Sequence, residues 1–219
     1  MDDKNYDELW CEQAIDRLIQ NGLDHFFIAP GSRSTLLVLA LAKNPQAKLF
    51  WGIDERSVAF TALGYSKSHK KPGVVICTSG TAVANLYPAV VESFMSFVPL
   101  LLVTADRPAW QRDCGANQVI FQANIFSNHI NHSFDIPPPS PKYSTLTVID
   151  QAINYSMDLR RGPVHVNLQF EEPLRKVSKE CSNILPNKNN RKFGDYLRNF
   201  LETHRGIFVV GELLPDEEQ

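Results

Sequence analysis

This chain of 219 residues lacks both an excess of charge of one sign and a long hydrophobic run. Its formal net charge is -2, so the composition gives no electrostatic footprint for nucleic acid or for an anionic membrane surface. The longest apolar runs, such as "PLLLVTA", have the length of a strand and are too short to span a membrane. The acidic, polar start "MDDKNYDELW" does not have the pattern of a signal peptide. These absences favour a small or polar substrate.

The four cysteines also lack any pattern. They are scattered along the chain without a CxxC pair and without a Cys/His cluster at metal-ligand spacing: Cys11, Cys77, Cys114 and Cys181. Neither a zinc site nor a disulfide framework is therefore indicated. We expect reduced thiols and a cytoplasmic protein.

Short apolar runs alternate with longer amphipathic stretches. The apolar runs read as strands buried on both faces, at residues 25–30, 47–54, 73–80, 98–106, 162–169 and 206–212. The amphipathic stretches read as helices, at residues 6–21, 34–44, 55–69, 81–97 and 142–160. This alternation predicts an α/β fold with a doubly wound, mainly parallel sheet and helices on both of its faces.

The composition also predicts domain boundaries. We expect one domain over residues 1–173, a polar linker over 174–192 and the start of a second α/β domain over 193–219. Residues 111–141 read as a long polar connection, which in a compact domain is functional or mobile. In doubly wound sheets ligands bind at the carboxyl ends of the strands, so the segments that directly follow the strands are the candidate site.

Five of these segments, in order along the chain, resemble the N-terminal, pyrimidine-binding domain of thiamine-diphosphate enzymes. Within that group they are most similar to the 2-succinyl-5-enolpyruvyl-6-hydroxy-3-cyclohexene-1-carboxylate synthases of menaquinone biosynthesis. The segments are "APGSRST" (29–35), "DERSVAFTALGYSK" (54–67), "TSGTAVANLYPAVVES" (78–93), "TADRP" (104–108) and "DCGANQ" (113–118). The resemblance runs from about residue 8 to about residue 173 and implies a thiamine-diphosphate pyrimidine-domain fold.

The acid pair Asp54–Glu55 has two interpretations. Carboxylates in the first turn of a helix interact favourably with the helix dipole, which accounts for both residues without any chemistry. The resemblance implies more for Glu55: a hydrogen bond to N1′ of the cofactor's aminopyrimidine, which favours the tautomer that activates thiamine diphosphate. We expect a buried strand end to provide the desolvated setting that this role requires. Asp54 is predicted to be the helix cap.

The segment "PGSRS" also has two interpretations. Ser32 or Ser34 could cap the following helix. Alternatively, a serine hydroxyl, an arginine and backbone amides at a helix start form an anion site, and the resemblance implies that Ser32 and Arg33 bind substrate carboxylates.

The remaining segments supply further candidates. The resemblance implies that Thr78, Ser79 and Gly80 line the pyrimidine pocket as small residues that allow close approach of the backbone. It also implies that Arg107, Asn117 and Gln118 bind substrate, although Arg107 could instead form a salt bridge with Asp106. The histidines His129, His132 and His165 have no acid at ligand spacing and are predicted to be structural.

The resemblance implies decarboxylation of 2-oxoglutarate on thiamine diphosphate and 1,4 addition of the succinyl unit to isochorismate. It also implies Mg²⁺, and a homodimer or homotetramer, since the site of this family is built between subunits. The GDG sequence that anchors the metal is absent, so we expect an N-terminal part of a longer enzyme that is inactive by itself. Two alternatives remain open: another thiamine-diphosphate enzyme, such as an acetohydroxyacid synthase, and a non-catalytic binding domain.

Overall fold

The computed structural model describes residues 6–140 and 145–171. The predicted linker, and the helix and strand expected after it, lie outside the described residues. The helices are α1 (Tyr6–Gln20), α2 (Thr35–Lys43), α3 (Glu55–His69), α4 (Thr81–Asn85), α5 (Tyr87–Met95) and α6 (Thr145–Met157). The strands are β1 (His25–Ile28), β2 (Lys48–Trp51), β3 (Gly73–Cys77), β4 (Leu100–Asp106), β5 (His132–Ile136) and β6 (Pro163–Gln169).

The strands form one six-stranded sheet in the order β2-β1-β3-β4-β6-β5. Every pairing between neighbouring strands is parallel, which confirms the predicted doubly wound α/β fold. From β1 the chain moves outward to β2 and then crosses back to β3 on the other side of β1. The crevice between the carboxyl ends of β1 and β3 is therefore the topological switch point, where ligands bind in sheets of this kind.

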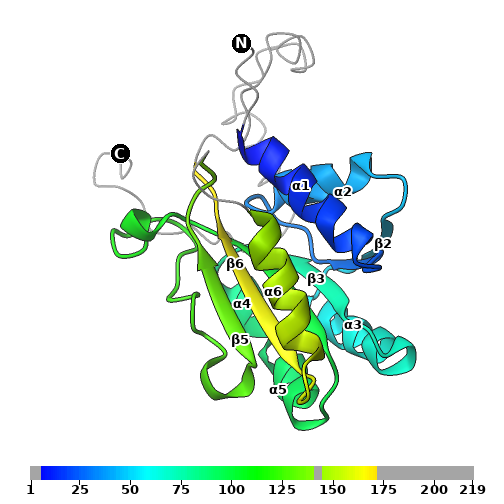
Figure 1. Cartoon of the computed structure of the whole chain (residues 1–219). Helices are drawn as coiled ribbons and strands as arrows, with labels where there is room; N and C mark the ends of the chain where they lie inside the picture. The colour runs from blue at the N-terminus through cyan, green and yellow to red at the C-terminus, as the bar shows by residue number, and fades with distance from the viewer. Residues whose placement is uncertain (1–5, 141–144, 172–219) are drawn as a thin grey trace, which may run out of the picture. The chain divides into compact units, whose positions relative to one another are not determined.

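Helices cover both faces of the sheet (Figure 1). Helices α1, α2 and α6 pack on one face, and α3, α4 and α5 pack on the other. Because successive residues of a strand point to opposite faces, the central strands contribute to both cores. In β3, Val74 and Ile76 join the first core, whereas Val75 and Cys77 join the second. This double burial explains why the central strands are apolar at nearly every position.

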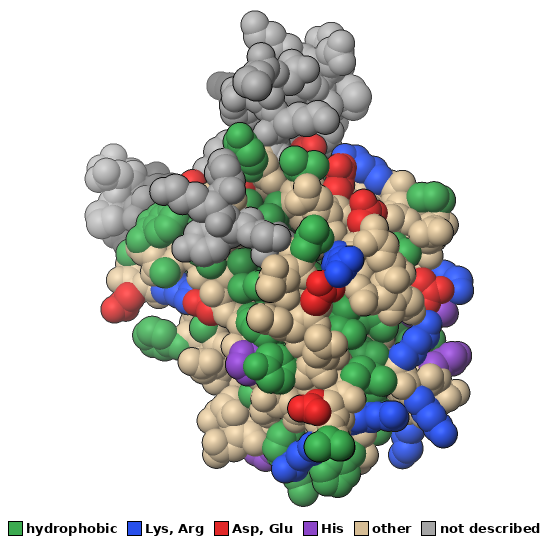
Figure 2. Space-filling model, viewed as in Figure 1, with side chains coloured by type: hydrophobic (Ala, Val, Ile, Leu, Met, Phe, Trp, Pro, Cys, Tyr) green, Lys and Arg blue, Asp and Glu red, His purple; other side chains and the backbone are tan. Residues whose placement is uncertain are grey.

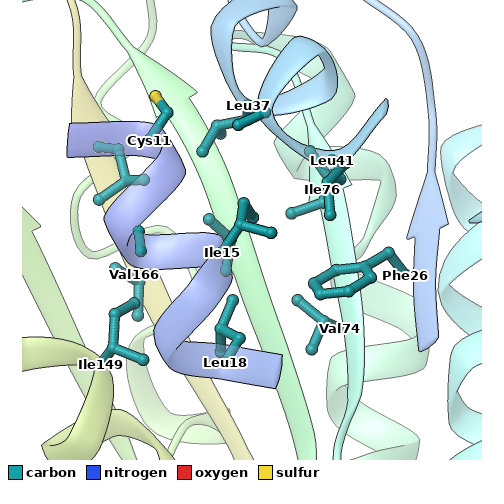
Figure 3. Packing of buried hydrophobic residues seen from close by; sticks show 14 of the residues in the cluster. Cys11, Ile15, Leu18, Phe26, Leu37, Leu41, Val74, Ile76, Ile149 and Val166 are labelled. Carbon is teal, nitrogen blue, oxygen red and sulfur yellow. The ribbon is translucent and has the colours of Figure 1, made fainter. Parts of the chain in front are cut away.

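Figure 3 shows the first of the two cores. Ile15 and Leu18 of α1 lie over the sheet, with Leu37 of α2 to one side and Ile149 of α6 to the other. All four side chains are almost completely buried. The amphipathic pattern of α1 thus has a clear cause, since one face of this helix packs against the sheet and the opposite face meets water.

The prediction that every strand is buried on both faces is wrong for β2. This strand forms an edge of the sheet, and Phe50 and Trp51 are 44% and 56% exposed. The apolar run that predicted the strand was correct for its position and wrong for its burial. Apolar composition indicates that the faces of a strand are suited to burial. It does not show whether the described part of the chain contains the residues that bury them.

Two further predictions about elements need correction. The polar connection at 111–141 contains β5, an edge strand whose half-buried sequence "HSFDI" lacks the apolar run used to identify strands. The helix predicted at 81–97 is divided at Leu86 into α4 and α5. Pro88 lies in the first turn of α5, where the missing N–H of proline costs nothing, and it would break a continuous helix.

The surface shown in Figure 2 carries interspersed acidic and basic side chains, with basic ones gathered where Figure 1 places α3. Lys67 and His69 lie in the last turn of α3, followed by Lys70 and Lys71. Cations at a helix C-terminus interact favourably with its dipole, so this cluster has a structural explanation. In the part of the chain that the structure describes, no helix has the length and apolar composition of a membrane span.

Buried polar side chains connect β4 and β6 near the middle of the sheet. The Thr104 hydroxyl donates to Asn167 Oδ1 at 2.9 Å and lies 2.7 Å from Nε2 of His165. His165 is completely buried, and this burial lowers its pKa to about 3. The prediction that His165 is structural agrees with this position, because a neutral, buried imidazole contributes to packing and to internal hydrogen bonds with Thr104 and Ser133.

We expect the stability of the chain to depend on pH through His165. Between about pH 7 and pH 5 an unfolded histidine takes up a proton, whereas the buried His165 does not. Stability therefore falls as the pH is lowered, and the wild-type chain should lose about 2 kcal/mol more over this range than His165→Gln. Urea unfolding at the two pH values measures this difference. An equal loss of unfolding free energy in the wild-type chain and in His165→Gln would contradict the conclusion that His165 is buried in its neutral form.

Candidate functional site

The turns that follow β1 and β3 meet at the switch point. A β-carbon on Gly31 would overlap the side chain of Thr78, so the contact between the two turns requires glycine at position 31. Thr78 and Ser79 are both buried, at 6% and 1% exposure. Two of the predicted site segments, 29–35 and 78–93, therefore lie together, although residues 36–77 separate them in the sequence.

Glu55 is the first residue of α3, and the residue before it caps this helix. Asp54 Oδ1 accepts hydrogen bonds from the backbone N and from Oγ of Ser57, both at 2.7 Å. These hydrogen bonds lower the pKa of Asp54. The prediction that Asp54 is the helix cap is confirmed, and the cap accounts for only one acid of the pair.

The Glu55 carboxylate lies near α4 and the end of β3. Asn85 Nδ2 donates to Glu55 Oε2 at 3.3 Å. Burial raises the pKa of the Cys77 thiol, and the negative charge of Glu55 raises it further. Cys77 is the last residue of β3, so this charge effect places the Glu55 carboxylate at the same end of the sheet as the switch point. Asn85 was not among the predicted site residues, and its only signal was a polar side chain in a helix of small residues.

The expected burial around Glu55 is not provided by β2, so that prediction is wrong. Glu55 is half-buried, and Trp51 and Ile53 just before it are 56% and 94% exposed. A carboxylate loses its hydration only where other atoms cover it. In the described part of the chain Glu55 therefore follows a segment with exposed apolar side chains at the edge of the sheet.

Ser32 and Arg33 lie on the turn that follows β1. Arg33 is 4% exposed, and its Nη1 donates to the carbonyl O of Phe170 at 2.8 Å, which connects this turn to the end of β6. Ser32 is exposed, and its carbonyl O accepts a hydrogen bond from Thr35 Oγ1 at 2.6 Å. Of the two predicted caps, Ser34 occupies the N-cap position of α2, but its side chain does not cap the helix, because Ser34 Oγ donates backward to Gly31 O.

The turn formed by Ser79 and Gly80 is bound to Gln118. Gln118 Nε2 donates to Ser79 O at 2.9 Å, and Ser79 Oγ donates to Gln118 O at 3.3 Å. Gly80 has a φ of 81°, and a β-carbon there would lie 2.7 Å from Gln118 Cγ. The structure thus brings the predicted pocket residues Ser79 and Gly80 next to the predicted substrate residue Gln118. Asn117 is exposed on the same loop.

Arg107 joins the same group of residues. Its Nη1 donates to Gln118 O at 3.4 Å, and its backbone N donates to Asp106 Oδ1 at 2.7 Å. The alternative in which Arg107 forms a salt bridge with Asp106 is wrong. Asp106 is completely buried and instead forms an ion pair with Arg112, at 2.9 Å, because its side chain points into the molecule.

A charge network that the sequence did not predict lies next to Arg107 in the chain, at Asp106 and Arg112. Arg112 bridges Asp106 and Asp135, with a distance of 2.7 Å to the latter. Burial raises the pKa of Asp106, although Asn167 and Arg112 oppose the shift. Burial also acts to raise the pKa of Asp135, but hydrogen bonds from Arg112, Asn167 and Gln169 lower it overall. No pattern in the sequence pairs these residues, since they meet only through the sheet.

The histidines do not form a site with these residues. His129 Nδ1 lies 3.1 Å from the hydroxyl of Tyr87, and His132 stacks on Tyr155 with ring centroids 4.3 Å apart. Among residues 6–140 and 145–171 there is no group of three or more His, Cys, Asp or Glu side chains that could hold a metal ion.

The described residues of the site thus offer one carboxylate and a turn of small residues, without a His, Cys, Asp or Glu cluster for a metal ion. Glu55 supplies an anionic acceptor at the switch point, and the Thr78–Gly80 turn supplies small residues that allow close approach. These features fit the aminopyrimidine of thiamine diphosphate. Arg107 carries its guanidinium donors at the same end of the sheet, whereas Arg33 Nη1 donates to Phe170 O and Gln118 Nε2 donates to Ser79 O.

Comparison with known proteins identifies relatives over most of the chain. The 2-succinyl-5-enolpyruvyl-6-hydroxy-3-cyclohexene-1-carboxylate synthase of Salinibacter ruber is 45% identical over 190 residues, which cover 85% of this chain and 32% of that protein. The protein of the same name from Chlorobaculum tepidum is 48% identical over 177 residues, covering 80% of this chain and 30% of that protein. The chain thus spans about a third of the length of these relatives.

Among solved structures, benzoylformate decarboxylase from Polynucleobacter necessarius matches with a TM-score of 0.65 and 18% identity. The match covers 77% of this chain and 32% of that chain, and it supports the fold alone. A family model described as "Thiamine pyrophosphate enzyme, N-terminal TPP binding domain" matches residues 11–131, more than half of the 219 residues. This chain therefore belongs to the thiamine pyrophosphate enzyme family, as an N-terminal TPP binding domain.

Proposed function

We propose that this chain is the pyrimidine-binding part of a thiamine-diphosphate-dependent transferase that makes 2-succinyl-5-enolpyruvyl-6-hydroxy-3-cyclohexene-1-carboxylate in menaquinone biosynthesis. The enzyme decarboxylates 2-oxoglutarate and adds the succinyl unit to isochorismate in a 1,4 addition. The observation that carries the proposal is the position of Glu55, which accepts a hydrogen bond from Asn85 of α4, the helix that follows β3 and the predicted pocket turn. The names of the relatives with 45% and 48% identity support the choice of reaction.

Glu55 is the proposed catalytic residue. When bound, thiamine diphosphate supplies the carbanion chemistry that decarboxylates 2-oxo acids. The Glu55 carboxylate holds a proton at N1′ of the aminopyrimidine through a charge-assisted hydrogen bond, which favours the active tautomer. Asn85 orients this carboxylate by donating to Oε2. Thr78, Ser79 and Gly80 form the wall against which the ring lies.

The proposed substrate residues are Ser32, Arg33, Arg107, Asn117 and Gln118. Both substrates carry carboxylates, and the planar fork of an arginine matches a carboxylate in a bidentate arrangement. The proximity of Arg107 Nη1 to Gln118 O, at 3.4 Å, supports action of these two residues on one substrate. The packing of Gln118 against Gly80 supports a substrate site next to the pyrimidine.

The rest of the enzyme would complete the site. We propose that residues 1–173 form the pyrimidine domain, that 174–192 are a linker and that 193–219 begin a middle domain. Mg²⁺ and the diphosphate would be held mainly by a C-terminal domain. A second subunit of a cytoplasmic homodimer or homotetramer would cover Glu55, and the exposure of Trp51 and Ile53 supports a covering surface at this edge.

Glu55→Gln in the full-length enzyme should retain cofactor binding and lose most of its activity. Glutamine fills the same space but cannot hold the proton at N1′, so we expect kcat to fall by about 100-fold or more. Asp54→Asn is the matched control, because asparagine caps a helix as well as aspartate does. Calorimetry of cofactor binding and the rate of CO₂ release measure the two effects. Near-normal turnover by Glu55→Gln would exclude the proposed role.

The isolated chain of 219 residues should not turn over substrate. With thiamine diphosphate, Mg²⁺ and 2-oxoglutarate supplied, we expect no CO₂ release above that of a sample without protein. The reason is that the metal-anchoring GDG sequence of the enzymes that the chain resembles does not occur among the 219 residues. Release of CO₂ by this chain alone would contradict the proposal that another domain must bind the diphosphate and Mg²⁺.

A further inference from the structure

Gln122 lies in the polar connection between β4 and β5, yet its side chain is completely buried. A buried primary amide must satisfy two donor hydrogens and a carbonyl oxygen. Gln122 Nε2 donates to the carbonyl O of Ala105 at 2.9 Å and to Asn167 Oδ1 at 2.7 Å. Its Oε1 accepts from the backbone N of Gly80 at 2.9 Å. The amide is therefore fully paired in one orientation.

The partners of Gln122 belong to two different halves of the site. Gly80 is in the turn proposed to hold the pyrimidine. Ala105 is near the end of β4, two residues before the proposed substrate residue Arg107. One side chain, from the connection between β4 and β5, thus fixes the backbone after β3 to the backbone at the end of β4.

The backbone of Gly80 requires such a connection. Its φ of 81° and ψ of -142° are accessible to glycine and strained for other residues. Gln118, which also has a positive φ of 57°, packs directly against Gly80. Glycine can adopt many other conformations at little cost, and the hydrogen bond from Gly80 N to Gln122 holds this one from inside the molecule.

We propose that Gln122 is a positioning residue that sets the distance between the pyrimidine turn and the substrate residues Arg107 and Gln118. This inference rests on the proposed function for its effect on catalysis, whereas the hydrogen bonds themselves do not depend on it. Gln122 contacts neither substrate nor cofactor and acts through Gly80. Small displacements of positioning groups are costly, since about 1 Å of misplacement can reduce a rate by about 100-fold.

Gln122→Glu is the most informative variant. A glutamate can still accept the hydrogen bond from Gly80 N, but when ionised it cannot donate to Ala105 O or to Asn167 Oδ1. Asn167 cannot compensate by turning its amide, because its Nδ2 already donates to Asp106 and Asp135, each at 2.9 Å. Protonation of the glutamate restores one donor. In the full-length enzyme, kcat/KM of this variant relative to wild type should fall by at least about 10-fold as the pH rises from about 6 to about 9.

Gln122→Met removes every hydrogen bond at similar volume, and Gln13→Met on the exposed face of α1 is its matched control. We expect Gln122→Met to lower kcat/KM for 2-oxoglutarate by about 10-fold to 100-fold at every pH, and the control to remain at the wild-type value. In the 219-residue chain, hydrogen exchange at the Gly80 amide should be about 10-fold faster in Gln122→Met than in the control.

Two results would overturn the proposal. One is a kcat/KM of Gln122→Glu relative to wild type that does not change with pH. The other is hydrogen exchange at the Gly80 amide that is equally fast in Gln122→Met and the control. If Gln122→Met does not fold, the pH dependence of kcat/KM of Gln122→Glu relative to wild type tests the proposal by itself. If the wild-type enzyme does not decarboxylate 2-oxoglutarate, the proposed function fails, and exchange at Gly80 still decides whether Gln122 holds this turn.

Discussion

The contact between the turns after β1 and β3 is the constraint on which the rest of the site depends. Gly31 must lack a side chain because Thr78 occupies that space, and this contact sets the separation of the two turns at the switch point. The contact exists because β1 and β3 are neighbours, each buried on both faces between two layers of helices. The apolar cores thus determine where the polar residues meet, and the polar residues determine what the site can bind.

The acid pair at the start of α3 divides two tasks between neighbouring residues. Asp54 caps the helix through Ser57 and so fixes where the helix begins. Glu55, one residue later, is then directed toward Asn85 and the end of β3. A single carboxylate could not do both, because a cap must accept hydrogen bonds from its own helix. The proposed cofactor role therefore depends on Asp54 for position, although Asp54 takes no part in the proposed chemistry.

Much of the fold could be predicted from the sequence because its signals are local. Apolar runs located the central strands, and a polar residue before a helix identified Asp54 as a cap. The burial of β2 and the presence of β5 could not be read in the same way, because both depend on what lies beside an edge strand. Arg112 and Gln122 were missed for a related reason. Each looks like an ordinary polar residue of a loop, and only the sheet brings it to Asp106 or Gly80.

Glu55 is only half-buried in the described domain, which spans about a third of the length of its relatives. The residues just before Glu55 include the exposed Trp51 and Ile53, so the proposed chemistry needs a covering surface. The most direct test of this account is a crystal structure of the full-length enzyme with thiamine diphosphate bound. We expect the Glu55 carboxylate within about 3 Å of N1′ of the aminopyrimidine, with Trp51 and Ile53 covered. A pyrimidine bound away from Glu55 would contradict the central claim.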